Sequence, residues 1–330
     1  MSEHVPLLSV RDLHVTYAAA GATPVPAVRG VDIELDVGET LGLAGESGCG
    51  KSSLAGALLR LLPRGSKVTG EVLLDGEDVL GMKPGRLRAV RWTDLAIVFQ
   101  GALHTLNPVQ RVGDQIGEAI RLHSKGKSQS AVRTRVGELL ELVGLPARRA
   151  RDYPHQLSGG QRQRVLIGLA LACEPRLLIA DEPTTALDVM VQAQVLRLLE
   201  DLQEQFGLAT IFITHDLSTL ASVCRRLAVM YAGRIVEQGP SHEVFAGPTH
   251  PYTRALAGAF PVIGDQAFRM APAGLPGDPP DPRHLPDGCP FHPRCPAAVE
   301  ACSSVPMELW PAGPGRAAAC VHAPGSPVPA

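Results

Sequence analysis

The hydrophobic pattern from Leu8 to about Gly239 alternates between a period typical of strands and one typical of helices. Residues Leu8–Tyr17 alternate apolar and polar side chains, as a half-buried strand does. Short apolar runs predict further strands at Thr40–Ala44, Leu95–Phe99, Leu177–Ala180 and Thr210–Thr214, and a hairpin at Leu227–Glu237 that turns near Ala232 and Gly233. Apolar residues at helical spacing predict helices over Ser53–Leu62, Ser130–Val143 and Asp188–Gln205, the last closed by Gly207. Together they indicate an α/β fold with a mostly parallel sheet covered on both faces.

Two stretches depart from this alternation. From about Gly101 to Val165 the pattern is helical with loops, which predicts a helical insertion into the α/β core. From about Pro240 proline and glycine become more frequent and the periodicity fades, so residues 262–330 are expected to form an irregular tail. We therefore predict a first domain at 1–240, with a helical subdomain at about 101–165, and a C-terminal extension at 241–330.

Composition and charge exclude several classes of protein. A hydrophobic fraction of 45% over 330 residues is enough for a sizeable core, and a net charge of −2 provides no general basic field for nucleic acid. Met1–Pro6 is polar and predicts no secretory signal. Because no apolar run approaches the roughly 18 residues that span a bilayer, we expect a cytosolic chain or one peripheral to a membrane.

A phosphate-binding loop is predicted directly after the strand Thr40–Ala44. Its eight residues fit G-x-x-x-x-G-K-[ST]: Gly45, Glu46, Ser47, Gly48, Cys49, Gly50, Lys51 and Ser52, with Ser53 following. Backbone N–H groups and the N-terminus of the next helix would surround the phosphates of ATP. Lys51 would pair with the β and γ phosphates, and Ser52 would ligate Mg²⁺. Lys51 and the helix terminus are also expected to lower the pKa of Cys49.

Two adjacent carboxylates end the apolar strand Leu177–Ala180. Asp181 would hold Mg²⁺ through its water shell, and Glu182 would polarise the water that attacks the γ-phosphate. The alternative is that two acidic residues simply begin a surface loop. The phosphate loop upstream favours the catalytic interpretation.

One segment resembles the signature of the ABC ATPases, which other phosphate-loop proteins lack. It comprises Leu157, Ser158, Gly159, Gly160 and Gln161. The resemblance implies a phosphate-loop (RecA-like) core in which Ser158 starts a second anion-binding helix. Because one fold cannot aim both helix termini at the same γ-phosphate, it also implies a head-to-tail dimer with two sandwiched ATP molecules.

Further positions match the same family residue by residue. The resemblance implies that Tyr17 stacks on adenine, although a tyrosine at a strand end could equally belong to the core. It implies that Gln100 contacts Mg²⁺ and the attacking water, and that Asp188 acts across the dimer. His215 would bond the γ-phosphate and orient Glu182. Glu182, His215 and Gln100 are thus the expected catalytic residues.

The segments His250–Leu256 and Leu106–Pro108 resemble the oligopeptide/dipeptide (peptide/nickel) importer subfamily. That resemblance implies an ATPase subunit of a translocase on the cytoplasmic face of the membrane. Its partners would be a second ABC ATPase subunit, more often a different chain than a copy, two membrane permease subunits and an external substrate-binding protein, with no nucleic acid. Gly101 and Ala102 stand where the family usually carries an acidic residue and a proline, which concerns coupling to the permease.

Three alternatives remain open. The importer could carry nickel or another small solute instead of peptides. The chain could be a soluble ABC ATPase acting on ribosomes or nucleic acid, although one cassette without sustained heptads disfavours this. It could also bind ATP only as a regulatory subunit.

The chain has seven cysteines, of which four fall in the tail: Cys289, Cys295, Cys302 and Cys320. The subfamily resemblance includes this set, and its spacing differs from that of paired C-x2-C zinc ribbons. Four thiolates suit a [4Fe–4S] cluster or, alternatively, Zn²⁺. The other alternative is that these thiols are inert. Cys173 and Cys224 are expected in the core.

Overall fold

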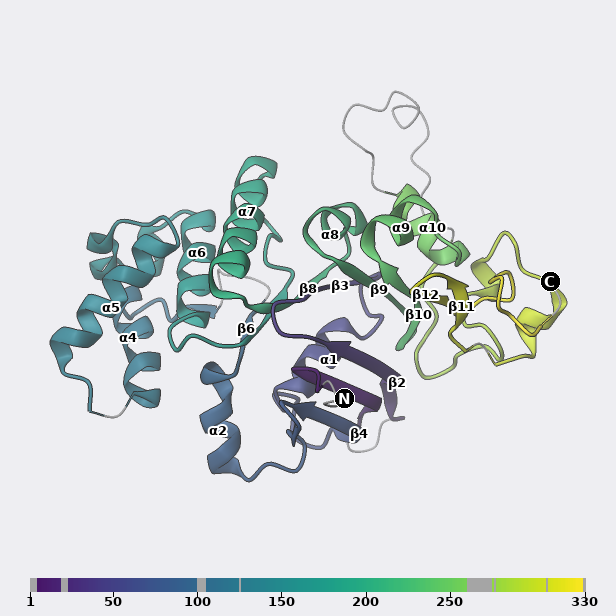
Figure 1. The fold of residues 1–330 in the computed structure, drawn as a ribbon, viewed down its shortest axis with the longest axis horizontal. Coiled ribbons are helices and arrows are strands. Elements are labelled where there is room, and N and C mark those ends of the chain that lie inside the picture. The colour runs from purple at the N-terminus through teal and green to yellow at the C-terminus, as the bar shows by residue number, and fades with distance from the viewer. Residues whose placement is uncertain are drawn as a thin grey trace. The chain divides into compact units, whose positions relative to one another are not determined.

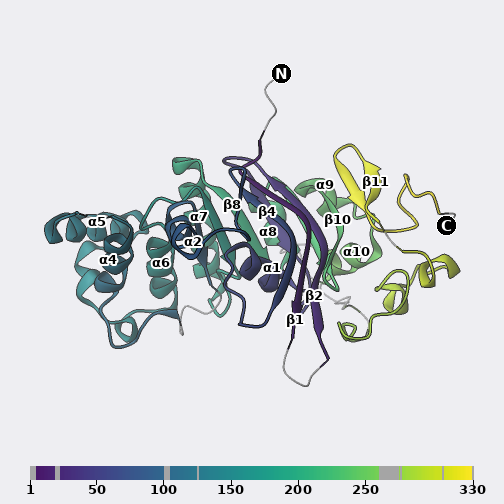
Figure 2. The ribbon, with the colours of Figure 1, turned by 90° about the horizontal axis from the view of Figure 1, so that it is seen from below.

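The computed structural model describes residues 5–18, 23–99, 105–124, 126–259, 275, 277–306 and 308–328 (Figures 1 and 2). The chain divides into two compact units. The first unit comprises Met1–Asp36, Thr40–Leu80 and Phe212–Ala330, and the second comprises Val37–Glu39 and Gly81–Ile211. The chain therefore leaves the first unit and returns to it.

An antiparallel sheet begins the first unit. Its order is β2 (Val25–Leu35), β1 (Leu8–Tyr17), β4 (Lys67–Leu74) and β5 (Glu77–Asp78). The pattern predicted β1 with these bounds from the alternation of apolar residues in the sequence, although Leu8, Ser9 and Val10 are all buried and Arg11 and Asp12 are both exposed. It missed β2, where Gly30 has a φ of 69° and the pairing shifts register, so the alternation of apolar residues is interrupted.

A second group of strands in the first unit carries the phosphate loop. The buried strand β3 (Thr40–Ala44) runs parallel to β9 (Arg226–Tyr231), and β9 pairs antiparallel with β10 (Arg234–Pro240). The described residues of this unit include the helices α1 (Lys51–Leu58), α8 (Leu217–Val223), α9 (Ser241–Ala246) and α10 (Pro251–Gly258). Helix α1 ends earlier than predicted, because Arg60 adopts a left-handed φ of 51° and the Leu61 N–H turns back to the Gly56 carbonyl.

The second unit consists mainly of helices, with a few short strands. Strands β6 (Leu95–Val98) and β7 (Leu177–Asp181) are parallel neighbours. Its helices are α2 (Pro84–Thr93), α4 (Val112–His123), α5 (Gln129–Leu142), α6 (Gly159–Ala170) and α7 (Val189–Phe206), with short 3-10 turns at Ala147–Arg151 and Pro154–Gln156. Helix α7 ends at Gly207 in the left-handed conformation, as predicted. Strand β8 (Ala209–Thr214) leads the chain back into the first unit.

Two expectations about the fold need correction. The strands form a mixed α/β arrangement and not a mostly parallel one, because β1, β2 and β4 are joined by hairpin-type pairing. The tail is only partly irregular: β11 (Trp310–Gly313) and β12 (Arg316–Ala318) form a hairpin, and β12 pairs with β10. Short 3-10 turns lie at His292–Arg294 and Glu300–Ser303. In the part of the chain that the structure describes, no helix has the length and hydrophobicity to cross a bilayer.

Candidate nucleotide site

The predicted phosphate loop lies between β3 and α1. Gly45, Gly48 and Gly50 all have positive φ angles, of 153°, 81° and 109°. A Cβ on Gly50 would lie 2.2 Å from the Ala27 carbonyl oxygen, so a side chain does not fit there. The loop is also fastened from outside, because the Gly233 N–H donates to the Cys49 carbonyl over 2.9 Å. The glycines therefore serve both the turn and its packing.

Lys51 is buried at the start of α1 and bends back over the loop. Its Nζ donates to the carbonyl oxygens of Gly45, over 2.7 Å, and of Glu46, over 2.9 Å. This places the ammonium inside the ring of loop residues, where a polyphosphate would need it. Ser52, the next residue, is exposed.

Tyr17 lies beside this loop, at the end of β1. Its hydroxyl donates to Ser53 Oγ over 2.9 Å, and its ring is half-buried. The structure thus joins two residues that are 36 positions apart in the sequence. The partly exposed ring stays available for an adenine base.

The expectation for Cys49 is wrong in its direction. The thiol is buried, and burial raises its pKa more than the nearby Lys51 ammonium lowers it. Cys49 is therefore a protonated filler of the loop at neutral pH, and sequence proximity to a cation overestimated its reactivity.

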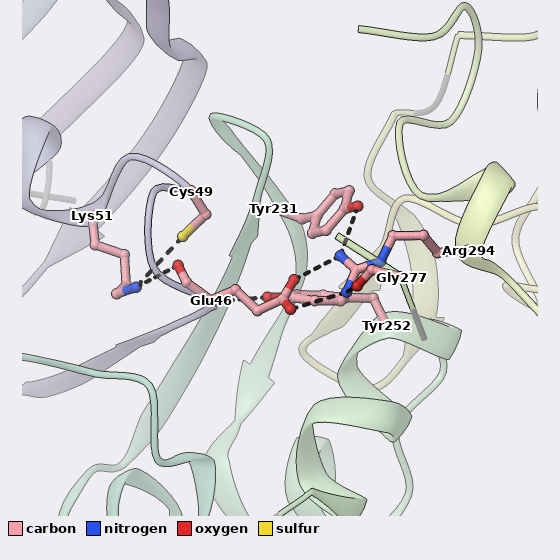
Figure 3. A network of polar contacts seen from close by, with 7 residues as sticks. All are labelled: Glu46, Cys49, Lys51, Tyr231, Tyr252, Gly277 and Arg294. Atoms are coloured by element: carbon pink, nitrogen blue, oxygen red, sulfur yellow. Dashed lines mark hydrogen bonds and ion pairs between the residues drawn. The ribbon is translucent and has the colours of Figure 1, made fainter. Parts of the chain in front are cut away.

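Two residues that the sequence analysis did not assign to the nucleotide site hold Glu46, and a third, Tyr231, bonds one of them (Figure 3). Arg294 donates to its carboxylate through Nη1, over 2.8 Å, and Nη2, over 3.0 Å. The Glu46 backbone N–H donates to the Tyr252 hydroxyl over 2.8 Å, and Tyr231 accepts from Arg294. No local signal pairs Arg294 with a residue 248 positions earlier, so sequence reasoning had no means to find it.

His215 follows β8 in the first unit and is exposed. The next residue, Asp216, caps α8 by accepting from the N–H groups of Ser218 and Thr219. Burial alone would raise the pKa of Asp216, but the hydroxyl groups of Ser218 and Thr219, which also donate to this carboxylate, outweigh it together with the backbone N–H groups and lower that pKa. The cap orients the chain that carries His215. Gln100, predicted to contact Mg²⁺, lies outside the described residues.

The predicted acidic pair lies in the second unit, at the end of β7. Asp181 is buried on the strand, and Glu182 follows with a φ of 46°. A non-glycine residue in this left-handed region is strained, and such strain commonly marks functional sites. The Thr185 hydroxyl donates to Glu182 Oε2 over 2.8 Å and fixes the carboxylate.

The predicted signature also lies in the second unit, at the start of α6. Ser158 Oγ accepts from the Gln161 N–H, and Gln161 Oε1 accepts from the Ser158 N–H, which together form a capping box. A Cβ on Gly160 would lie 2.4 Å from Val191 Cγ1, so this glycine also permits α6 to pack on α7. Leu157 is buried, whereas Ser158 is exposed.

Asp188 caps the neighbouring helix α7. Its Oδ1 accepts from the Val191 N–H over 3.0 Å. The sequence analysis gave it only a role across a dimer, so the cap is an additional role that the structure reveals.

The four tail cysteines are free thiols and line one small pocket in the first unit. Burial, with a smaller contribution from the neighbouring thiols, raises the pKa values of Cys289 and Cys320 to about 11. Within the described ranges, no group of three or more His, Cys, Asp or Glu side chains is arranged to hold a metal ion, so the structure does not support the metal site predicted for these cysteines. His250 and His292 line the same pocket.

Comparisons with known proteins agree with this arrangement. The model of the ABC transporter family matches residues 28–185, and that of the oligopeptide/dipeptide transporter C-terminal region matches residues 236–302. The chain is 45% identical to the oligopeptide transport ATP-binding protein OppD of Salmonella typhimurium over 95% of this chain and 93% of that protein. The chain belongs to the ABC transporter ATP-binding proteins. The predicted family and α/β fold class are thus confirmed.

Two further relatives of this ABC protein extend the comparison. It is 46% identical to the dipeptide transport ATP-binding protein DppD of Bacillus subtilis over 91% of this chain and 89% of that one. Among solved structures, the ATP-binding cassette MJ0796 bound to ADP and Pi matches with a TM-score of 0.64 and 29% identity, covering 71% of this chain and 98% of that one. That structure is described as a dimer in a post-hydrolysis state.

Proposed function

We propose that this chain is the ATP-hydrolysing subunit that powers an importer for peptides. The observation that carries the proposal is that one unit holds both the phosphate loop and the oligopeptide/dipeptide C-terminal region, joined through Glu46 and Arg294. The names of the relatives, which transport oligopeptides or dipeptides, supply the substrate class.

The site residues take the following roles. Lys51 and the loop N–H groups bind the phosphates of ATP, Tyr17 stacks on adenine, and Ser52 holds Mg²⁺. On the second unit, Asp181 holds the hydrated Mg²⁺ and Glu182 polarises the attacking water. His215 and Gln100 complete the set at the γ-phosphate.

A second ABC ATPase subunit would complete each nucleotide site. The start of α7 supports such a partner, because Val189 and Met190 directly follow Asp188 and are 68% and 72% exposed. Two large apolar side chains beside a residue assigned to the dimer contact would be covered by a second subunit. Ser158–Gln161 would then meet the γ-phosphate held by that partner.

Membrane subunits are the remaining partners. We propose that the chain binds two permease subunits as a peripheral protein on the cytoplasmic face, and that an external binding protein delivers the peptide. Closure of the ATPase dimer would drive the permease, and phosphate release would reopen it.

A [4Fe–4S] cluster in the cysteine pocket is a separate proposal. The four thiols line one pocket, and four thiolates suit a cluster of this kind, with Zn²⁺ as the alternative occupant. His250 also lines this pocket. Its Nδ1 accepts from the Tyr252 N–H, and its buried Nε2 has no hydrogen-bond partner among the described residues, so this N–H could donate to a sulfur. Bound there, the cluster would join the four cysteine-bearing segments of the extension to one another and stabilise its fold.

Anaerobic purification tests the cluster. We expect visible absorbance and about four iron atoms per chain by assay. Both should be lost after Cys302→Ser and kept after Cys173→Ser, since Cys173 lies outside the pocket. Colourless, iron-free protein would refute the cluster. Stoichiometric zinc in that protein would show that the cysteines bind Zn²⁺ instead.

The importer is tested by Glu182→Gln in the assembled complex. Because Gln cannot accept the proton of the attacking water, turnover should fall by about 10²–10⁴-fold while MgATP binding remains and the closed dimer accumulates. Peptide uptake into vesicles should fall in parallel. Undiminished hydrolysis would exclude Glu182 as the base. ATP-driven uptake of nickel without peptide, or co-purification of nucleic acid, would contradict the peptide importer.

A further inference from the structure

Arg294 connects the C-terminal extension to the phosphate loop inside the first unit (Figure 3). Its guanidinium forms two parallel hydrogen bonds to the Glu46 carboxylate, over 2.8 and 3.0 Å. The Arg294 side chain is only 8% exposed and that of Glu46 is 20% exposed. A bidentate pair shielded from water in this way is stronger and more directional than a surface ion pair.

Residues of the extension and of β9 together hold the Arg294 side chain in place. Its guanidinium also donates to the Tyr231 hydroxyl, over 3.2 Å, and to the Gly277 carbonyl, over 3.1 Å. It lies over the rings of Phe291 and Tyr231, at 5.8 and 5.9 Å from their centroids. Because these contacts limit its rotamers, the cation presents a fixed fork to the loop.

Glu46 is held at every polar group that the structure describes. Its carboxylate accepts from Arg294, its N–H donates to Tyr252, and its carbonyl accepts from Lys51. Burial raises the pKa of Tyr252, so this hydroxyl stays protonated at neutral pH. The extension therefore sets the path of the loop that carries Lys51.

The charge of Glu46 is the reason this contact matters. A carboxylate in a loop that receives a polyphosphate repels the ligand, unless a cation neutralises it. We propose that Arg294 is a positioning residue of the nucleotide site: it neutralises Glu46 and holds the loop open for phosphate. This proposal rests on the nucleotide site proposed above and gives the extension a role in ATP binding.

The first test is Arg294→Ala in the full chain. With Glu46 left uncompensated, the Kd for Mg²⁺–mant-ATP and the KM for ATP should both rise about tenfold, since hydrogen bonds to charged groups contribute this much or more. The kcat at saturating ATP should stay within about twofold, because neither residue meets the attacking water. Arg283→Ala is the matched control, since Arg283 pairs with Asp281 on the surface of the extension.

The decisive test adds Glu46→Gln. Alone it should lower the Kd, because Gln keeps an acceptor for Arg294 and leaves the charge of that cation to attract the phosphates. Combined with Arg294→Ala it should recover most of the lost affinity, whereas Arg294→Lys should fall between wild type and Arg294→Ala.

Three results would overturn the proposal: an unchanged Kd in Arg294→Ala, an equal loss in Arg283→Ala, or additive losses in the double variant. Were Arg294→Ala to misfold, the Lys variant and the double variant would still decide. A wild-type chain that binds no mant-ATP would instead refute the nucleotide site itself.

Discussion

Replacing a loop glycine by alanine should have very different costs at Gly50 and Gly48, although both lie in the left-handed region. Their φ angles are 109° and 81°. A Cβ on Gly50 would lie 2.2 Å from the Ala27 oxygen and 2.9 Å from Met230 Cε, whereas a Cβ on Gly48 has no described atom within 4 Å. The two substitutions therefore share the backbone strain and differ in the steric term.

The magnitudes follow from those two terms. The left-handed conformation costs about 1–2 kcal/mol for an L-residue, partly offset by about 0.4–1 kcal/mol because alanine restricts the unfolded chain. Overpacking against backbone adds about 1–3 kcal/mol at Gly50. We expect the unfolding free energy to fall by about 1 kcal/mol in Gly48→Ala and by about 2–4 kcal/mol in Gly50→Ala.

Urea unfolding without nucleotide measures this difference, since bound ATP would itself stabilise the native state. Gly137→Ala is a further control, because that glycine lies in α5 and a Cβ there would meet Ala147 at an acceptable 3.4 Å. Equal losses at Gly48 and Gly50, or a larger loss at Gly48, would show that the close approach to Ala27 does not govern the loop.

Two further outcomes are expected from groups whose roles the structure revealed. Burial lowers the pKa of His250 from 6.5 to about 3. Between these two pH values the imidazole is protonated in the unfolded chain and neutral in the folded one. Lowering the pH from 8 to 5 should therefore reduce the unfolding free energy by about 2 kcal/mol. In His250→Asn, which keeps an acceptor for the Tyr252 N–H, the unfolding free energy measured with urea should fall less over the same pH range. An identical fall would show that His250 is not the source of the pH dependence. Asp188→Ala should lower the unfolding free energy by about 1 kcal/mol through loss of the α7 cap, and Asp188→Asn should hardly change it. Equal losses in the two variants would show that the cap does not contribute to stability.

Local signals predicted most of the strands and helices that carry the site. Strands β1 and β3 have the predicted bounds, and the end of α7 at Gly207 is where the glycine placed it. These elements were predictable because each kind of burial leaves a pattern in the sequence. A strand buried on one face shows alternating apolar residues, a strand buried on both faces shows a continuous apolar run, and a helix shows apolar residues at helical spacing. Strand β2 was missed because a register shift near Gly30 interrupts its alternation.

The sequence by itself determined which residues have the chemistry to bind a nucleotide. The phosphate loop, the acidic pair and the signature are contiguous motifs, in which the spacing along the chain is the spacing in space. Even the capping box of Ser158 and Gln161 is readable in this way, because a helix turn joins residues three positions apart.

Only the tertiary structure decided what surrounds those residues. Cys49 has a raised pKa because burial outweighs the nearby cation, and burial depends on strands far away in the sequence. Glu46, one of the variable positions of the loop motif, acquires its role from Arg294, which is 248 positions later. A contact between distant residues leaves no local period or spacing, because the fold alone brings them together, so this part of the site could be seen only in three dimensions.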